Sequence, residues 1–319
     1  MKTVHEITLN SGYRMPVLGM GTATYPVPSA EIVESSVLIA IELGYRHFDT
    51  ASLYKSEAPL GRAISEALRR GILTSRDEIF VTTKLWCGHA HPDLVLPAIH
   101  NSLKALGLDY VDLYLIHFPA RINKTEMSFE VKKEDLLPLD MKGTWQAMEE
   151  CCRLGLAKSI GVSNFSSKKL SEILGFATIP PAVNQVEMHP LWQQRKLTEF
   201  CTDKNIHASA YSPLGGRGVL WGSNIVFDSE QIKYIAQAKG KSIAQICLRW
   251  GFEQGVSIIP KSFNKDRLRE NMEIFDWELS KEEVEKISLL PQNRIFTGEY
   301  LVSPTGPFRS VDELWDGEI

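Results

Sequence analysis

Four residues in the N-terminal part of the chain are of types that can move a proton together. Asp49 and Tyr54 lie five residues apart in FDTASLYKSE, Lys84 follows in TTKLW, and His117 ends LYLIH. A tyrosine has an ordinary pKa of about 10, so it is a poor acid–base group at neutral pH. A lysine ammonium beside it would lower that pKa, and a carboxylate would keep the lysine charged and oriented. These residue types predict a proton-transfer group centred on Tyr54.

The same residues also fit a structural role. Asp49 and Lys84 could form an ion pair that holds two strands together, with Tyr54 an ordinary loop aromatic, and residue types alone favour neither interpretation. A histidine at a strand end is often a core residue with its hydrogen bonds satisfied. If His117 lies near the other three, we expect a neutral imidazole that orients a substrate carbonyl.

The elements that would position these residues alternate between short β-type runs and helical patterns. A hairpin is predicted over 7–16, with its turn at Asn10-Ser11-Gly12. Eight strands follow, at 17–22, 47–51, 79–86, 111–119, 159–164, 182–188, 207–213 and 257–262. Helices are predicted at 31–43, 56–70, 92–106 (bent by Pro97), 142–154, 168–176, 194–204, 229–239, 243–254, 266–275 and 281–290.

Eight β/α units predict an α/β fold, a single (β/α)8 TIM barrel with an N-terminal β-hairpin and an extra C-terminal helix and tail. An open doubly wound sheet is the alternative. We expect one domain over 1–319, with the hairpin cap at 1–16, the barrel at 17–280, and the extra helix and tail at 281–319.

Polar side chains stand at the C-terminal ends of seven of these strands. Any one of them could simply bind loop backbone, but seven strands together predict a functional site, because these ends converge on one face of such a barrel. The residues are Asp49, Thr50, Lys84, His117, Ser163, Asn164, Gln185, Glu187, Tyr211, Ser212, Lys261 and Ser262.

Composition excludes several classes of function. The net charge is −4 and no basic block occurs, so we expect no nucleic-acid partner. No apolar run could span a bilayer, and no apolar leader opens the sequence. Five cysteines, an odd number, favour free thiols in a reducing cytoplasm. Cys87, His89 and His91 are possible metal ligands, but they lack a second ligand pair, so we interpret them as surface loop residues and predict no metal.

Seven segments together resemble the aldo-keto reductases over essentially the whole chain. They are MPVLGMGT, GYRHFDTASLYKSE, GLDYVDLYLIHFP, AKSIGVSNFS, PAVNQVEMHP, AYSPLGG and IPKSFNKDRLREN. The resemblance is strongest to the plant branch, which includes codeinone reductase-like, chalcone polyketide reductase-like, methylecgonone reductase-like and deoxymugineic acid synthase-like enzymes. It implies an NADPH-dependent carbonyl reductase in which Tyr54 gives a proton to the carbonyl oxygen, Asp49 and Lys84 tune Tyr54, and His117 positions the substrate.

The resemblance also implies a binding site for NADPH. Lys261 and Arg267 would suit the 2′-phosphate dianion, which favours NADPH over NADH. Tyr211 would stack on the nicotinamide, and Ser163, Asn164 and Gln185 would bind its carboxamide. The remaining residues implied for the cofactor are Thr22, Ala23, Asp49, Ser212, Leu214, Gly216, Ser262, Phe263, Asn264, Glu270 and Asn271.

The substrate pocket is expected to depart from that of many relatives. Position 118 is Phe where many have Trp, and position 23 is Ala where the aldose-reducing branch often has Trp. A small side chain at 23 should admit bulky ketones, with Trp86 as a pocket wall and loops 120–140, 214–228 and 292–309 supplying the rest. The resemblance implies a cytoplasmic monomer of plant specialised metabolism that acts on a small-molecule carbonyl. The alternative is an NADP(H)-binding regulatory barrel with little turnover.

Overall fold

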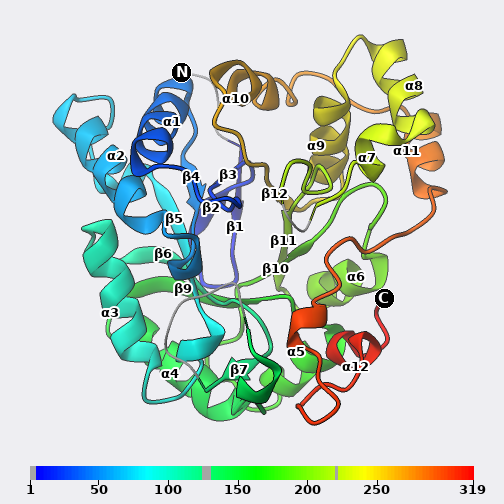
Figure 1. The fold of residues 1–319 in the computed structure, drawn as a ribbon. Coiled ribbons are helices and arrows are strands. Elements are labelled where there is room, and N and C mark those ends of the chain that lie inside the picture. Colours follow the sequence, from blue (N-terminus) through cyan, green and yellow to red (C-terminus); the bar gives the residue numbers. More distant parts are fainter. Residues whose placement is uncertain (1–4, 124–130, 220–221) are drawn as a thin grey trace.

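Parallel strands form a closed barrel at the centre of the protein (Figure 1). The computed structural model describes residues 5–123, 131–219 and 222–319. The eight strands are β3 (Met20–Gly21), β4 (His47–Asp49), β5 (Phe80–Leu85), β6 (Val111–Ile116), β9 (Ala157–Ser163), β10 (Val183–Glu187), β11 (His207–Tyr211) and β12 (Ser257–Ile259). The barrel closes where Gly19 N donates to Ile258 O (2.9 Å) and Gly21 N donates to Pro260 O (3.0 Å). An open sheet has no such bonds between its edge strands, so the predicted (β/α)8 barrel is confirmed.

Helices surround the barrel and connect its strands (Figure 1). They are α1 (Ala30–Leu43), α2 (Glu57–Arg69), α3 (Val95–Leu106), α4 (Met141–Arg153), α5 (Ser167–Leu174), α6 (Arg195–Asp203), α8 (Glu230–Lys239), α9 (Ile243–Glu253), α10 (Lys265–Asn271) and α11 (Lys281–Ser288). Most agree with the predicted ranges within one to three residues. Two short helices, α7 (Ile225–Asp228) and α12 (Val311–Trp315), were not predicted. Because α3 begins at Val95, Pro97 lies in its first turn, where the missing N–H has no helical acceptor to lose.

Close packing between helices depends on a glycine in α2. Leu60, Ala63, Ile64 and Ala67 form the buried face of this helix, as its 3.6-residue periodicity predicts. A Cβ at Gly61 would lie 1.9 Å from the backbone oxygen of Leu106, the last residue of α3. Only glycine therefore allows α2 to approach the end of α3 this closely.

The N-terminal hairpin covers the end of the barrel at which the strands begin. It is formed by β1 (Glu6–Thr8) and β2 (Arg14–Pro16), which pair antiparallel. Its Leu9 and Met15 belong to one apolar cluster with Phe80 and Val183, the first residues of β5 and β10. The polar strand ends lie at the opposite end of the barrel.

Most of the remaining short elements lie around the polar end of the barrel. The 3-10 helix η1 (Ser52–Tyr54) follows β4, and η3 (Cys87–His89) follows β5. A two-stranded ribbon joins β7 (Arg121–Ile122) to β8 (Leu136–Leu137). The 3-10 helix η4 (Lys133–Asp135) precedes β8, and η5 (Glu299–Leu301) lies in the tail. The remaining one, η2 (Arg76–Glu78), precedes β5 and lies at the opposite end of the barrel. Among the described residues, no helix has the length and apolar character needed to cross a membrane.

Candidate active site

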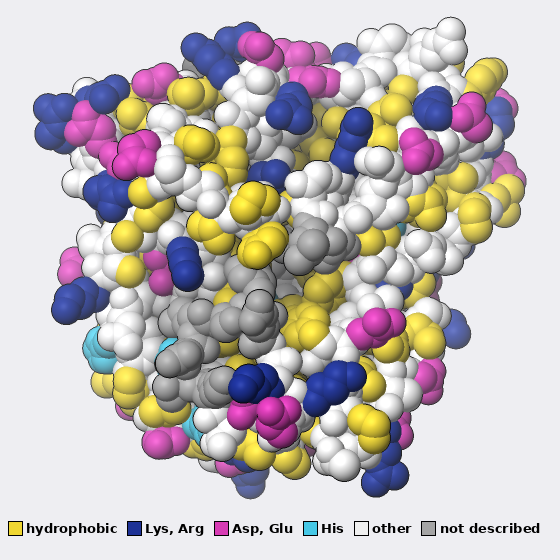
Figure 2. All heavy atoms as spheres, in the orientation of Figure 1, with side chains coloured by type: hydrophobic (Ala, Val, Ile, Leu, Met, Phe, Trp, Pro, Cys, Tyr) yellow, Lys and Arg dark blue, Asp and Glu magenta, His cyan; other side chains and the backbone are white. Residues whose placement is uncertain are grey.

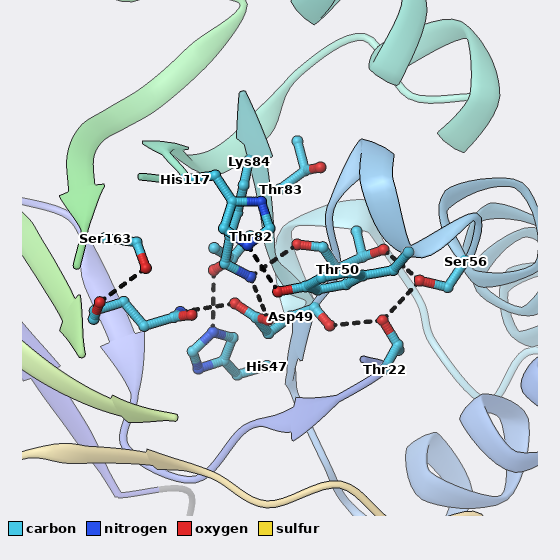
Figure 3. Close-up of polar contacts among 12 residues, drawn as sticks. Thr22, His47, Asp49, Thr50, Ser56, Thr82, Thr83, Lys84, His117 and Ser163 are labelled. Atoms are coloured by element: carbon cyan, nitrogen blue, oxygen red, sulfur yellow. Dashed lines mark hydrogen bonds and ion pairs between the residues drawn. The ribbon is translucent and has the colours of Figure 1, made fainter. Parts of the chain in front are cut away.

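A buried ion pair between β4 and β5 forms the floor of the site. Lys84 Nζ donates to Asp49 Oδ1 (2.5 Å) and to Thr50 O (3.0 Å), as Figure 3 shows. The second carboxylate oxygen of Asp49 accepts from Gln185 Nε2 (2.8 Å). Burial lowers the pKa of Lys84, while the Asp49 carboxylate opposes that shift. Each charge is therefore matched by a partner inside the barrel, as buried charges require.

Tyr54 lies beside this pair at the end of η1. Its hydroxyl is 3.1 Å from His117 Nε2, and the Lys84 ammonium is 5.0 Å from its ring centroid. Burial raises the pKa of Tyr54 well above its ordinary value, and the Asp49 carboxylate and Tyr211 add to the rise. The expectation of a lowered pKa is wrong for this structure, because burial, the largest cause, and the Asp49 carboxylate outweigh the attraction of the Lys84 ammonium for the phenolate. Tyr54 is a phenol that holds its proton at neutral pH.

His117, which directly follows β6, is a neutral imidazole. Burial lowers its pKa well below the ordinary histidine value, and the Lys84 charge lowers it further. The ring of Phe118 stacks on it, with centroids 4.9 Å apart and planes inclined by 15°. Its Nδ1 is buried and has no hydrogen-bond partner in the part of the chain that the structure describes. The structure thus gives His117 the protonation state expected for a hydrogen-bonding residue at a carbonyl.

A chain of three hydroxyl groups fixes the strand ends behind Asp49. The Ser56 hydroxyl lies 2.7 Å from those of Thr22 and Thr50, and Thr22 Oγ1 also donates to Asp49 O (2.9 Å) (Figure 3). Thr22, which was expected near the cofactor, is buried and does not line the cavity itself, although its neighbours Gly21 and Ala23 do. Ser56 was predicted only as the first residue of the helix 56–70, and in the structure its side chain does not cap that helix.

A second polar group lies across the site, at the ends of β9, β10 and β11. Tyr211 Oη donates to Asn164 Oδ1 (2.8 Å), and Asn164 Nδ2 donates to His117 O (3.0 Å). Ser163 Oγ donates to Gln185 O (2.8 Å). These bonds hold Tyr211 and Asn164 as one rigid unit facing Asp49 and Tyr54.

One cavity of about 910 Å³ joins most of the predicted site residues. Thr22, Lys84 and Asn264 lie outside its wall: Lys84 is behind Asp49, and Asn264 caps α10 by accepting from Arg267 N (3.0 Å). The predicted residues on its wall are Ala23, Asp49, Tyr54, Trp86, His117, Phe118, Ser163, Asn164, Gln185, Tyr211, Ser212, Leu214, Gly216, Lys261, Ser262, Phe263, Arg267, Glu270 and Asn271. A volume of this order accommodates a cofactor-sized ligand.

The end of the cavity beyond β12 carries positive charge. Burial lowers the pKa of Lys261, and the Arg267 guanidinium lowers it further. Neither cation forms an ion pair with a carboxylate within residues 5–123, 131–219 and 222–319. On the face drawn in Figure 2, acidic and basic side chains are interspersed, and hydrophobic side chains lie both near the centre and at the periphery.

Several wall residues were not predicted individually. Leu53, Arg217, Phe296 and Tyr300 all line the cavity. The loops 214–228 and 292–309 had been expected to contribute, but within them only Leu214 and Gly216 were named beforehand, from the family resemblance. Part of the third loop, 124–130, lies outside the described residues, and Ile122 and Leu136 from its remainder pack in the apolar cluster beside the cavity.

The proposed surface position of the Cys87 loop is wrong in part. Cys87 is buried in the apolar cluster with Trp86 and Phe118, and burial raises its thiol pKa well above the ordinary value. His91 Nε2 is within hydrogen-bond distance of Ile122 O (3.1 Å). No group of three His, Cys, Asp or Glu side chains suited to a metal occurs within the described ranges.

Comparisons with known proteins show relatives over nearly the whole chain. The model of the aldo/keto reductase family matches residues 17–290. The 7-acetyl-epi-neemfruitin B aldo-keto reductase of Melia azedarach is 56% identical over 318 residues, covering 99% of this chain and 98% of that protein. The NADPH-dependent codeinone reductase 1-4 of Papaver somniferum is 54% identical, covering 98% of each.

A solved structure is also similar to this chain. The aldo-keto reductase of Bombyx mori, in complex with NADP, superposes with a TM-score of 0.82 and 38% identity, covering 92% of this chain and 95% of that one. The family match, the relatives and the shared fold all lead to one conclusion. The chain belongs to the aldo/keto reductase family of oxidoreductases.

Proposed function

We propose that this protein is an NADPH-dependent carbonyl reductase that transfers a hydride to an aldehyde or ketone, with Tyr54 as the proton donor. One observation carries the proposal. The protonated Tyr54 phenol and the neutral His117 imidazole meet at 3.1 Å on the wall of the cavity whose other end carries Lys261 and Arg267.

The residues present fit NADPH. Lys261 and Arg267 are cations without carboxylate partners in the described chain, as a phosphate dianion requires. Gly216 lines the cavity with φ +64, a backbone conformation that favours glycine, and a Cβ there would lie 3.1 Å from Gly222 Cα, so this loop is tightly packed beside the cavity. Ser163, Asn164 and Gln185 would hold the carboxamide, and Tyr211 would face the ring. When bound there, the dinucleotide supplies a hydride from nicotinamide C4.

The protein groups perform the proton half of the reaction. A substrate carbonyl oxygen placed between Tyr54 Oη and His117 Nε2 would be oriented by both. As its carbon becomes saturated, the oxygen gains negative charge and becomes a far stronger base than a phenolate. Tyr54 then donates its proton to that oxygen, and the raised pKa ensures that the proton is present beforehand. The Lys84 ammonium, 5.0 Å from the ring centroid, favours the phenolate left behind.

The substrate is a small organic carbonyl of plant specialised metabolism: an alkaloid, polyketide, keto acid or sugar carbonyl. Relatives named for 7-acetyl-epi-neemfruitin B and codeinone support a bulky ketone, and so does the small Ala23 on the cavity wall. We further propose that the protein works as a cytoplasmic monomer.

Steady-state oxidation of NADPH against a panel of ketones, aldehydes, sugars and keto acids tests the function. We expect saturable turnover with at least one bulky ketone. Tight NADPH binding with no turnover across the panel would instead support a regulatory barrel.

A further inference from the structure

Glu187 is a buried carboxylate that the proposed reaction does not use. It is the last residue of β10 and is 1% exposed. Its Oε1 accepts from Ile295 N (2.9 Å) and its Oε2 accepts from Phe296 N (2.8 Å). His189 Nε2 also lies 3.0 Å from Oε1. A strand of the barrel thereby holds the backbone of the C-terminal tail, more than 100 residues later in the chain.

The segment held by Glu187 supplies part of the cavity wall. The Phe296 ring lies 5.6 Å from that of Phe118 and 6.0 Å from that of Tyr300, and Phe118 in turn stacks on His117. Phe296 and Tyr300 both line the cavity. A shift of the tail backbone would therefore move the aromatic wall that packs on Phe118, the ring stacked on His117.

A second set of contacts fixes the same segment on its other side. The Arg294 guanidinium lies 3.8 Å from the ring centroid of Trp315 and 4.7 Å from that of Trp192. Trp315 Nε1 donates to Thr297 O (2.7 Å). In Figure 1 the tail runs in orange and red from α11 to α12, which lies beside α5. The tail is thus anchored on both sides of Ile295 and Phe296.

We propose that Glu187 is a positioning residue for substrate recognition, which sets the place of Phe296 and Tyr300 through the tail backbone. The inference rests on the proposed function. Bonds from N–H groups to a buried carboxylate are stronger than those between neutral groups, so this anchor is stiff. Large carbonyls that reach Phe296 depend on it, whereas small ones that contact only Tyr54 and His117 depend on it little.

Glu187→Gln tests this inference, because its amide retains one acceptor oxygen and presents an NH2 group to the other tail N–H. The probes are the largest ketone and the smallest aldehyde that the unchanged protein reduces. We expect KM for the ketone to rise roughly tenfold with kcat within about twofold, and KM for the aldehyde to rise less than about threefold. Hydrogen exchange at the amides of Ile295 and Phe296 should accelerate by about tenfold or more, and the Kd for NADPH should not change.

Glu149→Gln is the matched control. Glu149 is 2% exposed and likewise accepts from two backbone N–H groups, of Thr178 (2.6 Å) and Ile179 (2.8 Å), but none of these residues lines the cavity. The Glu149→Gln variant should have a lower free energy of unfolding, but the ratio of its KM values for the ketone and the aldehyde should not change. Phe296→Leu should reproduce the selective rise in KM, and adding Glu187→Gln to it should have little further effect.

Equal changes in KM for both probes, or none for either, would overturn the role of Glu187 while leaving the reductase proposal intact. Unchanged exchange at Ile295 and Phe296 would overturn it too, by showing that the tail does not depend on the carboxylate. If none of the tested carbonyls supports NADPH oxidation by the unchanged protein, the proposed function itself fails. The exchange measurement then still decides whether Glu187 anchors the tail.

Discussion

Lys84 Nζ lies 2.5 Å from Asp49 Oδ1, and the two side chains are 1% and 5% exposed. A pair this deeply buried lies in surroundings of low polarity, where removing one partner leaves an uncompensated charge. The Asp49–Lys84 pair thus joins two strands of the barrel at the point where Tyr54 rests. The structural and chemical interpretations of these residues are compatible, and both can be tested.

Lys84→Met should affect stability and turnover together. We expect the free energy of unfolding to fall by about 3–5 kcal/mol, because Asp49 would retain only Gln185 as a partner among the side chains described above. We also expect kcat to fall about 10²-fold, since no cation would favour the Tyr54 phenolate. Urea unfolding and NADPH oxidation measure the two effects.

Lys158→Met is the control for that variant. Lys158 pairs with Asp77 (3.3 Å) and Asp112 (3.5 Å) near the start of β9, at the end of the barrel opposite the site. It should lower stability less and leave kcat unchanged. If kcat of Lys84→Met equals that of the unchanged protein, Lys84 takes no part in the proposed proton transfer.

Tyr54→Phe should abolish reduction while preserving the cofactor site. The substitution removes the hydroxyl that faces His117 and keeps the ring, so we expect kcat to fall at least about 10²-fold. The Kd for NADPH, measured by quenching of nicotinamide fluorescence, should stay within about twofold. Turnover close to that of the unchanged protein would show that another group donates the proton.

Lys261→Ala and Arg267→Ala should distinguish NADPH from NADH. Each removes a charge-assisted contact to the 2′-phosphate, worth about 1.5–3 kcal/mol, so the Kd for NADPH should rise by about tenfold or more. The Kd for NADH, which has no such phosphate, should change little. Lys265→Ala is the control, because Lys265 is an exposed residue of α10, the helix that also contains Arg267. Equal weakening of both cofactors would contradict the assignment of these residues.

Stability should decrease on acidification partly through His207. Its Nε2 accepts from Ser257 N (3.0 Å), which requires an unprotonated nitrogen, and burial lowers its pKa from 6.5 to about 4. Below pH 6.5 the unfolded chain therefore binds more protons at this residue than the folded chain does. The free energy of unfolding consequently decreases as the pH is lowered from 6.5 toward 4. The loss from this group, down to pH 4, is at most about 3 kcal/mol.

His207→Gln should reduce that pH dependence, because its amide oxygen can still accept from Ser257 N and does not titrate in this range. The measurement is urea unfolding at several pH values between 7 and 4. Parallel curves for the two proteins would show that His207 is not responsible. His47 and His117, whose pKa values burial also lowers, contribute to the slope that remains in the variant, as do carboxylates such as Glu66 and Glu149, whose pKa values hydrogen bonds lower.

The barrel and the residues on its strands could be predicted from the sequence because both depend on regular spacing. Alternating β and α patterns define the strands, and the strand ends then gather Asp49, Lys84 and His117 on one face. The pKa of Tyr54 could not be predicted, because its direction depends on burial and on how strongly Asp49 neutralises Lys84. Both are properties of packing rather than of residue type.

The tail residues of the cavity were beyond prediction for a different reason. Phe296 and Tyr300 belong to no long periodic element, and their positions follow from contacts with α12 and with Glu187, which lies more than 100 residues earlier in the chain. Helix α12 itself spans only five residues, too few for periodicity to reveal it. Segments of this kind take their conformation from the surface on which they lie.

The hairpin that covers one end of the barrel has a consequence for how the molecule could be rebuilt. Because Leu9 and Met15 fill the entrance at which the strands begin, that end serves only as support, and its loops can be exchanged or joined without reaching the chemistry. The opposite mouth has to admit both reactants. Substitutions that raise stability and substitutions that change substrate specificity can therefore be made at opposite ends of the barrel.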